Sequence, residues 1–246
     1  MPITGKARIV ARRSLSQSAY EALRTKILRG DLPLGTPLSR RKLAAELTMS
    51  MLPIGEALQR LEADGLIESR ARVGTRVRIP TEEDVRGHYV IREALETMSA
   101  RLFAERATAA ERLEMMEFAL VLDDHYDRAK KEKGDKQAEA VYDAHQLHAK
   151  FHMRLAECGR CAALHDAIDR NQTMVLNWLF NSASQFYKLP PHWHRTLMNE
   201  LNHGSPSSAD KAMRKHVRYG VDQVSRRIQT LARVWVDSEK GFRVRG

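Results

Sequence analysis

The sequence predicts a mainly α-helical protein with an N-terminal winged helix-turn-helix that carries a small β wing, and a C-terminal all-α helical bundle. Helical periodicity covers three short segments before residue 65, and two β-prone runs around a glycine follow them. Beyond Pro80 the apolar periods are long and glycine and proline are scarce. A chain of 246 residues can form two separate hydrophobic cores.

The first third of the chain contains three segments with helix start and stop signals. Ser39 and Ser50 are suitable N-caps, Gly30 begins a Gly-Asp-Leu-Pro turn, and Gly65 is suited to a left-handed helix end. The predicted helices are Leu15 to Arg29, Arg40 to Leu47, and Met51 to about Asp64. The runs 66–70 and 76–79 predict a two-stranded hairpin with a turn at Gly74, which completes a winged helix-turn-helix.

Pro80 marks the boundary, because Thr81 and the three acidic residues after it are typical of a helix start. The helices predicted beyond it are roughly 82–106, 108–131, 136–157, 161–187, 191–203 and 207–234, with a charged connection at 129–138. The predicted organisation is therefore a basic arm at 1–14, a winged helix-turn-helix at 15–79, an all-helical domain at 80–234, and a tail at 235–246.

The positive charge is concentrated in the first domain. Residues 1–79 contain 15 lysines and arginines against 7 acidic residues, whereas residues 80–246 contain 26 against 24. Basic residues placed in this way can neutralise phosphates and release counterions, so the distribution favours a nucleic-acid partner.

Other signals exclude several classes of protein. The chain has no apolar run of about 18 residues and no signal-peptide pattern, so a membrane span is not predicted and a cytoplasmic location is the expectation. Cys158 and Cys161 are the two cysteines. They lie at a helix junction without a second cysteine pair, so a redox or metal role is the weaker interpretation.

The segment from 18 to 79 resembles the DNA-binding domain of the GntR family. The resemblance is carried by Gly-Asp-Leu-Pro-Leu-Gly, Leu-Ala-Ala-Glu-Leu, Ser-x-x-Pro-Ile-x-Glu-Ala-Leu-Gln-Arg-Leu, Asp-Gly-Leu-Ile and the wing glycine. Two positions depart from the family: Met51 and Gly55 stand where an arginine is usual, which leaves the operator sequence open. The resemblance implies that the helix opened by Ser50 enters the major groove of double-stranded DNA.

The predicted DNA-contacting residues combine local charge with this resemblance. Arg41 matches a DNA-contacting position of the family. The wing arginines are expected near phosphates or the minor groove. The full predicted set is Arg40, Arg41, Lys42, Ser50, Arg60, Arg72 and Gly74. A winged helix that binds protein instead of DNA is the alternative.

Four histidines in the helical region suggest a metal site. His148 and His152 are four residues apart and therefore share one helix face, and His194 and His216 come from two further predicted helices. Helices that converge in a bundle commonly build metal sites in this way. The alternative is a metal-free pocket lined by these histidines. The others, including His145 and His203, are expected at the surface.

Residues 82–231 resemble the FCD effector domain of FadR-type GntR regulators. Val-Ile-Arg-Glu-Ala-Leu-Glu at 90–96, Phe-His-Met-Arg-Leu-Ala-Glu at 151–157, and the pair His194 and His216 carry the resemblance. It implies a divalent metal held by His152, His194 and His216, with His148 in place of the usual aspartate. An all-nitrogen set favours Zn or Ni. It also implies that Arg92 binds a small organic acid, with a salt bridge to Glu96 as the alternative.

The combined prediction is a transcription regulator, not an enzyme. We expect a homodimer, acting as a repressor at a pseudo-palindromic operator and responding to a small carboxylate-type effector. A metal-dependent enzyme in the helical bundle is the main alternative, but the sequence contains no His-Glu-x-x-His, nucleophile elbow or phosphate-binding glycine loop. A nonspecific architectural DNA-binding protein is the third.

Overall fold

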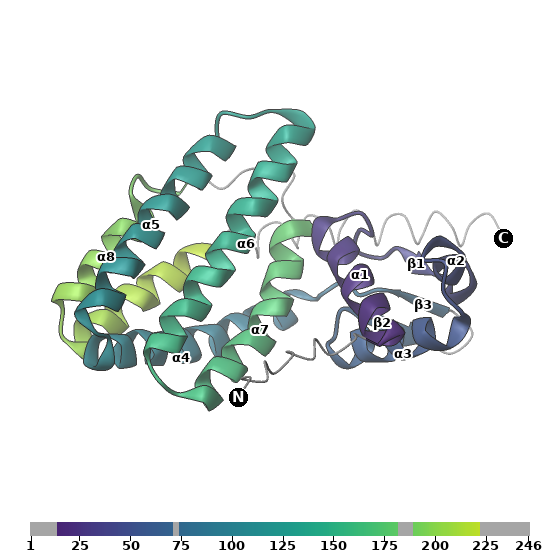
Figure 1. Ribbon diagram of the computed structural model, residues 1–246, viewed down its shortest axis with the longest axis horizontal. Coiled ribbons are helices and arrows are strands. Elements are labelled where there is room, and N and C mark those ends of the chain that lie inside the picture. Colours follow the sequence, from purple (N-terminus) through teal and green to yellow (C-terminus); the bar gives the residue numbers. More distant parts are fainter. Residues whose placement is uncertain (1–13, 71–73, 182–188, 222–246) are drawn as a thin grey trace, which may run out of the picture.

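The computed structural model describes residues 14–70, 74–181 and 189–221. A small domain of three helices and a sheet lies at one end of the molecule, and long helices form a bundle at the other (Figure 1). The fold class predicted from the sequence is confirmed. The predicted arm at 1–14 is described only at Ser14. The tail at 235–246, Arg72, and the predicted helical residues 182–187 and 222–234 lie outside the described residues.

The small domain begins with three helices whose ends follow from local sequence. The Ser14 and Ser39 side chains accept hydrogen bonds from backbone N–H groups in the first turns of α1 and α2, and Gly30 ends α1 with a left-handed φ of 82°. The helices are α1 (Leu15–Arg29), α2 (Arg40–Glu46) and α3 (Met51–Ala63). Helix α3 packs on α1 through Ile54, Leu58 and Leu61, so its opposite face is exposed.

The wing is a three-stranded antiparallel sheet of order β1-β3-β2, not the two-stranded hairpin predicted. The strands are β1 (Pro37–Leu38), β2 (Ile67–Arg70) and β3 (Gly74–Val77). Strand β1 has only two residues, so it is too short to show the alternation of apolar and polar residues that indicates a strand. Its pairing depends on Gly35, whose φ of 83° turns the chain so that the Gly35 N–H reaches the Val77 carbonyl at 2.9 Å.

The bundle begins with two helices that have capping boxes. Thr81 with Asp84, and Thr108 with Glu111, exchange side-chain and backbone hydrogen bonds at the starts of α4 and α5. The helices are α4 (Glu82–Arg106), α5 (Ala109–Ala129), α6 (Gly134–Cys158), α7 (Ala162–Asn181) and α8 (Trp193–His203). A further helix begins at Pro206 and continues to residue 221, and Ser205 accepts a hydrogen bond from the Ser208 N–H at its start. The charged connection before α6 is shorter than predicted, because α6 already begins at Gly134.

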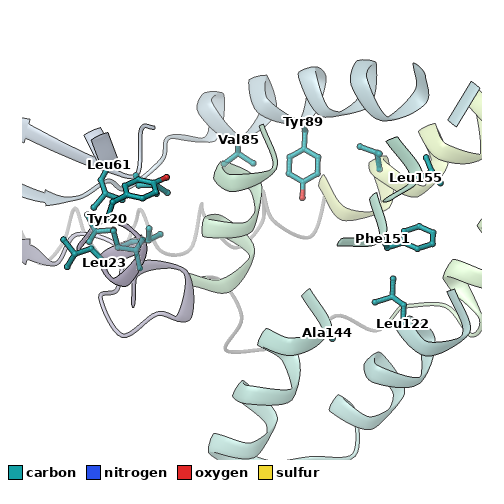
Figure 2. Close-up of a cluster of buried hydrophobic side chains, with 14 of the residues drawn as sticks. Tyr20, Leu23, Leu61, Val85, Tyr89, Leu122, Ala144, Phe151 and Leu155 are labelled. Carbon is teal, nitrogen blue, oxygen red and sulfur yellow. The ribbon is translucent and has the colours of Figure 1, made fainter. Parts of the chain in front are cut away.

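Buried apolar side chains extend through both parts of the molecule. Figure 2 shows Tyr20, Leu23 and Leu61 in the small domain, and Leu122, Ala144, Phe151 and Leu155 in the bundle, with Val85 and Tyr89 of α4 between the two groups. Helix α6 contributes Ala144, Phe151 and Leu155 to this core, and it packs most extensively against α5. No helix of the described part of the chain is long and apolar enough to cross a membrane.

The two parts are in contact where the end of α1 meets α6 and α7. Leu28 is 1% exposed and packs against Ala149 of α6, with Tyr142 beside them. The Arg29 guanidinium lies 4.9 Å from the centroid of the Tyr142 ring, a distance typical of a cation–π contact. Helix α6 therefore contributes to the bundle core and also contacts the small domain.

Candidate functional site

One candidate surface lies at the N-terminal ends of α2 and α3. Arg40, Arg41 and Lys42 form the first turn of α2, and all three are exposed. The helix macrodipole places partial positive charge at this end, so three cations there destabilise the helix unless an anion neutralises them. Duplex phosphates would supply such anions.

The outward face of α3 adjoins these cations. Met51 and Leu52, in its first turn, are 51% and 72% exposed. Ser50 is the N-cap, but its side chain makes no capping hydrogen bond, which leaves its hydroxyl available to a ligand. Apolar side chains in this position can contact thymine methyl groups in the major groove.

Two other predicted DNA-contacting residues have structural roles in the fold. The Arg60 guanidinium lies 3.9 Å from the Tyr20 ring centroid and donates to Gln17, so it joins α3 to α1. The Tyr20 hydroxyl donates to Asp64 at 2.6 Å, and burial together with that bond raises the pKa of Tyr20 to about 12. Gly74 begins β3 with a φ of 101°, which permits the turn of the wing.

The second candidate site is a cluster of the four predicted histidines inside the bundle. The His148 Nε2 atom lies 2.9 Å from His152 Nε2 and 3.2 Å from His216 Nε2. Ligand atoms of His148, His194 and His216 all lie within 4.8 Å of one another. His152, His194 and His216 are buried, and helix α6, helix α8 and the 206–221 helix position the four rings.

Two buried carboxylates orient two of these rings. Asp123 Oδ1 accepts a hydrogen bond from His194 Nδ1 at 2.8 Å, and Glu96 Oε2 lies 2.9 Å from His152 Nδ1. A proton on Nδ1 leaves the lone pair of Nε2 facing the cluster, as in the carboxylate–histidine pairs that support metal ligands. The sequence reasoning missed Asp123 entirely and considered Glu96 only as a partner of Arg92.

The electrostatics favour neutral imidazoles at His148, His194 and His216. Burial lowers the pKa of His148 and His216 well below the ordinary value, and the neighbouring histidines lower it further. Burial also lowers the pKa of His194, although Asp123 opposes that shift. Neutral imidazole nitrogens are the form that binds a transition metal.

The donor set fits a metal ion of the zinc or nickel type. Two nitrogens bound to tetrahedral zinc at about 2.0 Å are about 3.3 Å apart, close to the separations around His148. The buried His194 Nε2 has no hydrogen-bond partner within the described residues, so its lone pair could bind a metal ion. His152 is not one of the three histidines whose ligand atoms all lie within 4.8 Å of one another, but its Nε2 lies 2.9 Å from His148 Nε2, where it could serve as a fourth ligand.

A cavity of about 50 Å³ lies against the cluster, and Arg92, Tyr126 and Trp193 contribute to its lining. The Arg92 side chain is buried, with Nη2 3.5 Å from His152 Nε2 and Nε 3.8 Å from Glu96 Oε1. Its Nε makes no hydrogen bond to the described part of the chain. A buried guanidinium with an unsatisfied N–H beside a cavity is suited to an anionic ligand group.

His145 and His203 were both expected at the surface, but the structure shows that only His203 of the two is exposed. His145 is 2% exposed and lines the same cavity. Burial, with a contribution from Arg92, lowers the pKa of His145 to about 4. Its position three residues before His148 places it on the same side of α6, a spacing that could have indicated burial. The two cysteines belong to no metal-ligand group among the described residues.

Comparison with known proteins identifies the family. Residues 15–77 match the family described as bacterial regulatory proteins, gntR family, and residues 88–219, more than half of the chain, match the FCD domain. The chain belongs to the GntR family and has an FCD domain. It is thus a DNA-binding transcription regulator and not an enzyme, as the sequence predicted.

Relatives match over most of this GntR-family chain. A protein of Paenarthrobacter nicotinovorans named as a D-xylose utilization operon transcriptional repressor is 29% identical over 211 residues, which cover 85% of this chain and 88% of that protein. The repressor RspR of Escherichia coli is 26% identical over 208 residues, 83% of this chain and 86% of its own. A GntR regulator of Rhodococcus sp. RHA1 has the same fold, with a TM-score of 0.68 at 20% identity over 86% of this chain and 98% of that one.

Proposed function

We propose that this GntR-family regulator is a ligand-responsive repressor of the FadR subfamily that binds a pseudo-palindromic operator as a homodimer. The predicted set Arg40, Arg41, Lys42, Ser50, Arg60, Arg72 and Gly74 would contact DNA. Arg41 and Lys42 would bind phosphates, and the first turns of α3 would face base edges. Two relatives that match over most of both domains are named as repressors, which supports repression over activation.

In this proposal the helical domain holds a divalent metal, Zn or Ni, through His148, His152, His194 and His216. A metal bound there would attract an anionic ligand to the cavity and would hold the four rings in one arrangement. Arg92 would bind the carboxylate of a small organic acid. The cavity of about 50 Å³ beside Arg92 offers room for the carboxylate group of such an acid.

The observation that carries the proposal is the position of helix α6. His148 belongs to the histidine cluster, and the next residue, Ala149, is covered by Leu28 of the small domain. A ligand that favours one arrangement of the rings would therefore also favour one placement of α1, and operator affinity would change by the difference in its affinity for the two states.

The surface assigned to dimerisation is the exposed apolar face of α4. Val90, Ile91 and Met98 are 70%, 48% and 47% exposed, and the small residues Gly87 and Ala94 lie on the same side, where they permit close approach of a second helix. A second copy of the chain is the occupant that a palindromic operator requires. Sedimentation of a Val90→Glu variant should show monomers if this face forms the dimer, and unchanged dimers would refute the assignment.

The test of the whole proposal is a titration of labelled DNA from the gene's own upstream region with the purified protein. Binding should be salt-sensitive, and it should differ between protein loaded with Zn²⁺ and protein treated with a chelator. The His194→Ala variant should lose the metal response and retain DNA binding, Arg41→Ala should show the reverse, and the exposed His203→Ala should behave as wild type. Absence of sequence-preferring binding under all conditions would refute the function.

A further inference from the structure

The guanidinium of Arg40 lies against the bare side of Gly55. A methyl group placed on the Gly55 Cα would lie 3.4 Å from Arg40 Cζ, 3.5 Å from Nε and 3.6 Å from Nη1. These are ordinary van der Waals distances, so the planar group of Arg40 occupies the space that a longer side chain at 55 would fill. A residue of α2 thus lies directly on the surface of α3.

This contact lies at the edge of the outward face of α3. Gly55 is three residues after Leu52 and four before Gln59, and both of these side chains are exposed, whereas Ile54 and Leu58 point into the core. The N-terminal half of the second helix of a helix-turn-helix is the part that reaches base edges in the major groove. The Arg40 guanidinium is therefore added to the surface that faces the bases.

Arg40, like its neighbour Arg41, has no internal partner among the described residues. Within residues 14–70, 74–181 and 189–221 its guanidinium makes no hydrogen bond or ion pair, whereas Arg76 pairs with Glu68 and Arg60 is held by Tyr20 and Gln17. Its hydrogen-bond donors are therefore available, while contact with α3 restricts the positions that the side chain can adopt. Such restriction reduces the entropy lost when a ligand is bound.

We infer that Arg40 is a specificity-determining residue that reads a guanine of the operator across the bare surface of Gly55. The fork of a guanidinium matches the O6 and N7 acceptors of guanine in the major groove, and this bidentate contact distinguishes guanine from the other bases. Arg41 and Lys42 remain for the phosphates. The inference rests on the proposed DNA binding and assigns the base contact to α2 in addition to α3.

The first test compares the base preference of wild type, Arg40→Ala and Arg41→Ala by selection from a randomised duplex library, followed by titration of single-substitution operators. Arg40→Ala should lose about 10- to 100-fold of the discrimination at one G·C pair in each half-site. Arg41→Ala should weaken binding to all duplexes alike and reduce the salt slope by about one. If Arg40→Ala also weakens all duplexes alike, Arg40 is a phosphate contact and the inference is wrong.

The second test uses the space at Gly55. Gly55→Leu places side-chain atoms where the Arg40 guanidinium lies, so it should reduce discrimination at the same base pair as Arg40→Ala does. The control Ala63→Leu adds the same side chain at the exposed end of α3 and should leave that discrimination unchanged. The double variant Arg40→Ala, Gly55→Arg should regain preference for guanine there. Wild-type protein without any sequence preference would refute the proposed function, whereas preserved discrimination in Arg40→Ala refutes this inference alone.

Discussion

Replacement of Asp123 by alanine should weaken the metal binding that we propose for the helical domain. Asp123 Oδ1 accepts hydrogen bonds from the Nδ1 and the backbone N–H of His194 at 2.8 and 3.0 Å, and Oδ2 accepts from the Arg195 N–H at 3.2 Å. Burial raises the pKa of Asp123, but these bonds outweigh that effect and leave it below the ordinary value, so the carboxylate is charged at neutral pH. Loss of such a carboxylate typically lowers metal affinity about 10- to 100-fold.

Asp123→Ala should also lower the stability of the metal-free protein. The N-cap of α8 is His192, with a φ of 56° and no capping hydrogen bond of its own, so Asp123 of α5 supplies the cap from outside the helix. Loss of a cap costs about 0.5–2 kcal/mol. Asp123→Asn keeps an oxygen acceptor and removes the charge, so it should largely preserve the cap and show a smaller loss of affinity.

The assay is competition for Zn²⁺ with a chromophoric chelator at pH 7.5, together with urea unfolding of the metal-free protein. Asp124→Ala, the exposed neighbour on α5, is the matched control and should bind Zn²⁺ as wild type does. If folded Asp123→Ala retained wild-type affinity, His194 would not be a ligand that Asp123 supports, and the reasoning about the cluster would be refuted.

Three further predictions concern stability and coupling. Because the pKa of His145 is lowered to about 4 in the folded protein, the unfolded chain takes up a proton first as the pH falls. His145 should therefore contribute about 3 kcal/mol to the fall in unfolding free energy between pH 6.5 and pH 4. Urea unfolding with a chelator should show a weaker dependence on pH in His145→Gln than in wild type, and an equal dependence would contradict this. In the monomeric Val90→Glu background, where the proposed dimer face is not occupied, Gly87→Ala should stabilise α4 by about 0.5–1 kcal/mol because a Cβ there meets nothing within 4 Å. Gly204→Ala in the same background should destabilise, because its Cβ would lie 2.9 Å from Ser208 Cβ. Thermal unfolding that ranks the two variants in the opposite order would refute this. Leu28→Ala should lower the unfolding free energy by about 2–5 kcal/mol, because it empties the contact with Ala149 of α6. It should also reduce the effect of Zn²⁺ on DNA affinity, measured by fluorescence anisotropy. An undiminished effect would show that the coupling between the helical domain and the DNA-binding domain does not pass through this contact.

Much of the fold could be predicted because its signals are local. Ser39 caps a helix where a serine precedes an apolar period, and Thr81 forms a capping box with Asp84 three residues later. The β1 strand could not be predicted, because its two residues gain their conformation from pairing with β3 more than 35 residues away. Tertiary pairing of this kind leaves no periodic signal.

The candidate site was only partly predictable for the same reason. The i, i+4 spacing of His148 and His152 is visible in the sequence, whereas the distance between Asp123 and His194 depends on how α5 packs against α8. His145 was misassigned to the surface because its spacing of three residues from His148 was not used. The contact between Arg40 and Gly55 requires knowledge of how α2 crosses α3, so the sequence indicated only the unusual glycine.

Helix α6 contacts both the histidine cluster and the small domain, and this restricts how the regulator can evolve. A substitution near His148 that suits a new effector also disturbs the packing of Leu28 against Ala149. It therefore changes how strongly the effector alters DNA affinity as well as which effector is bound. Helix α8 and the 206–221 helix also line the cavity, and neither contributes a residue to the contact with Leu28. Divergence of effector preference among descendants of this chain should therefore accumulate on those two helices, while α6 changes slowly.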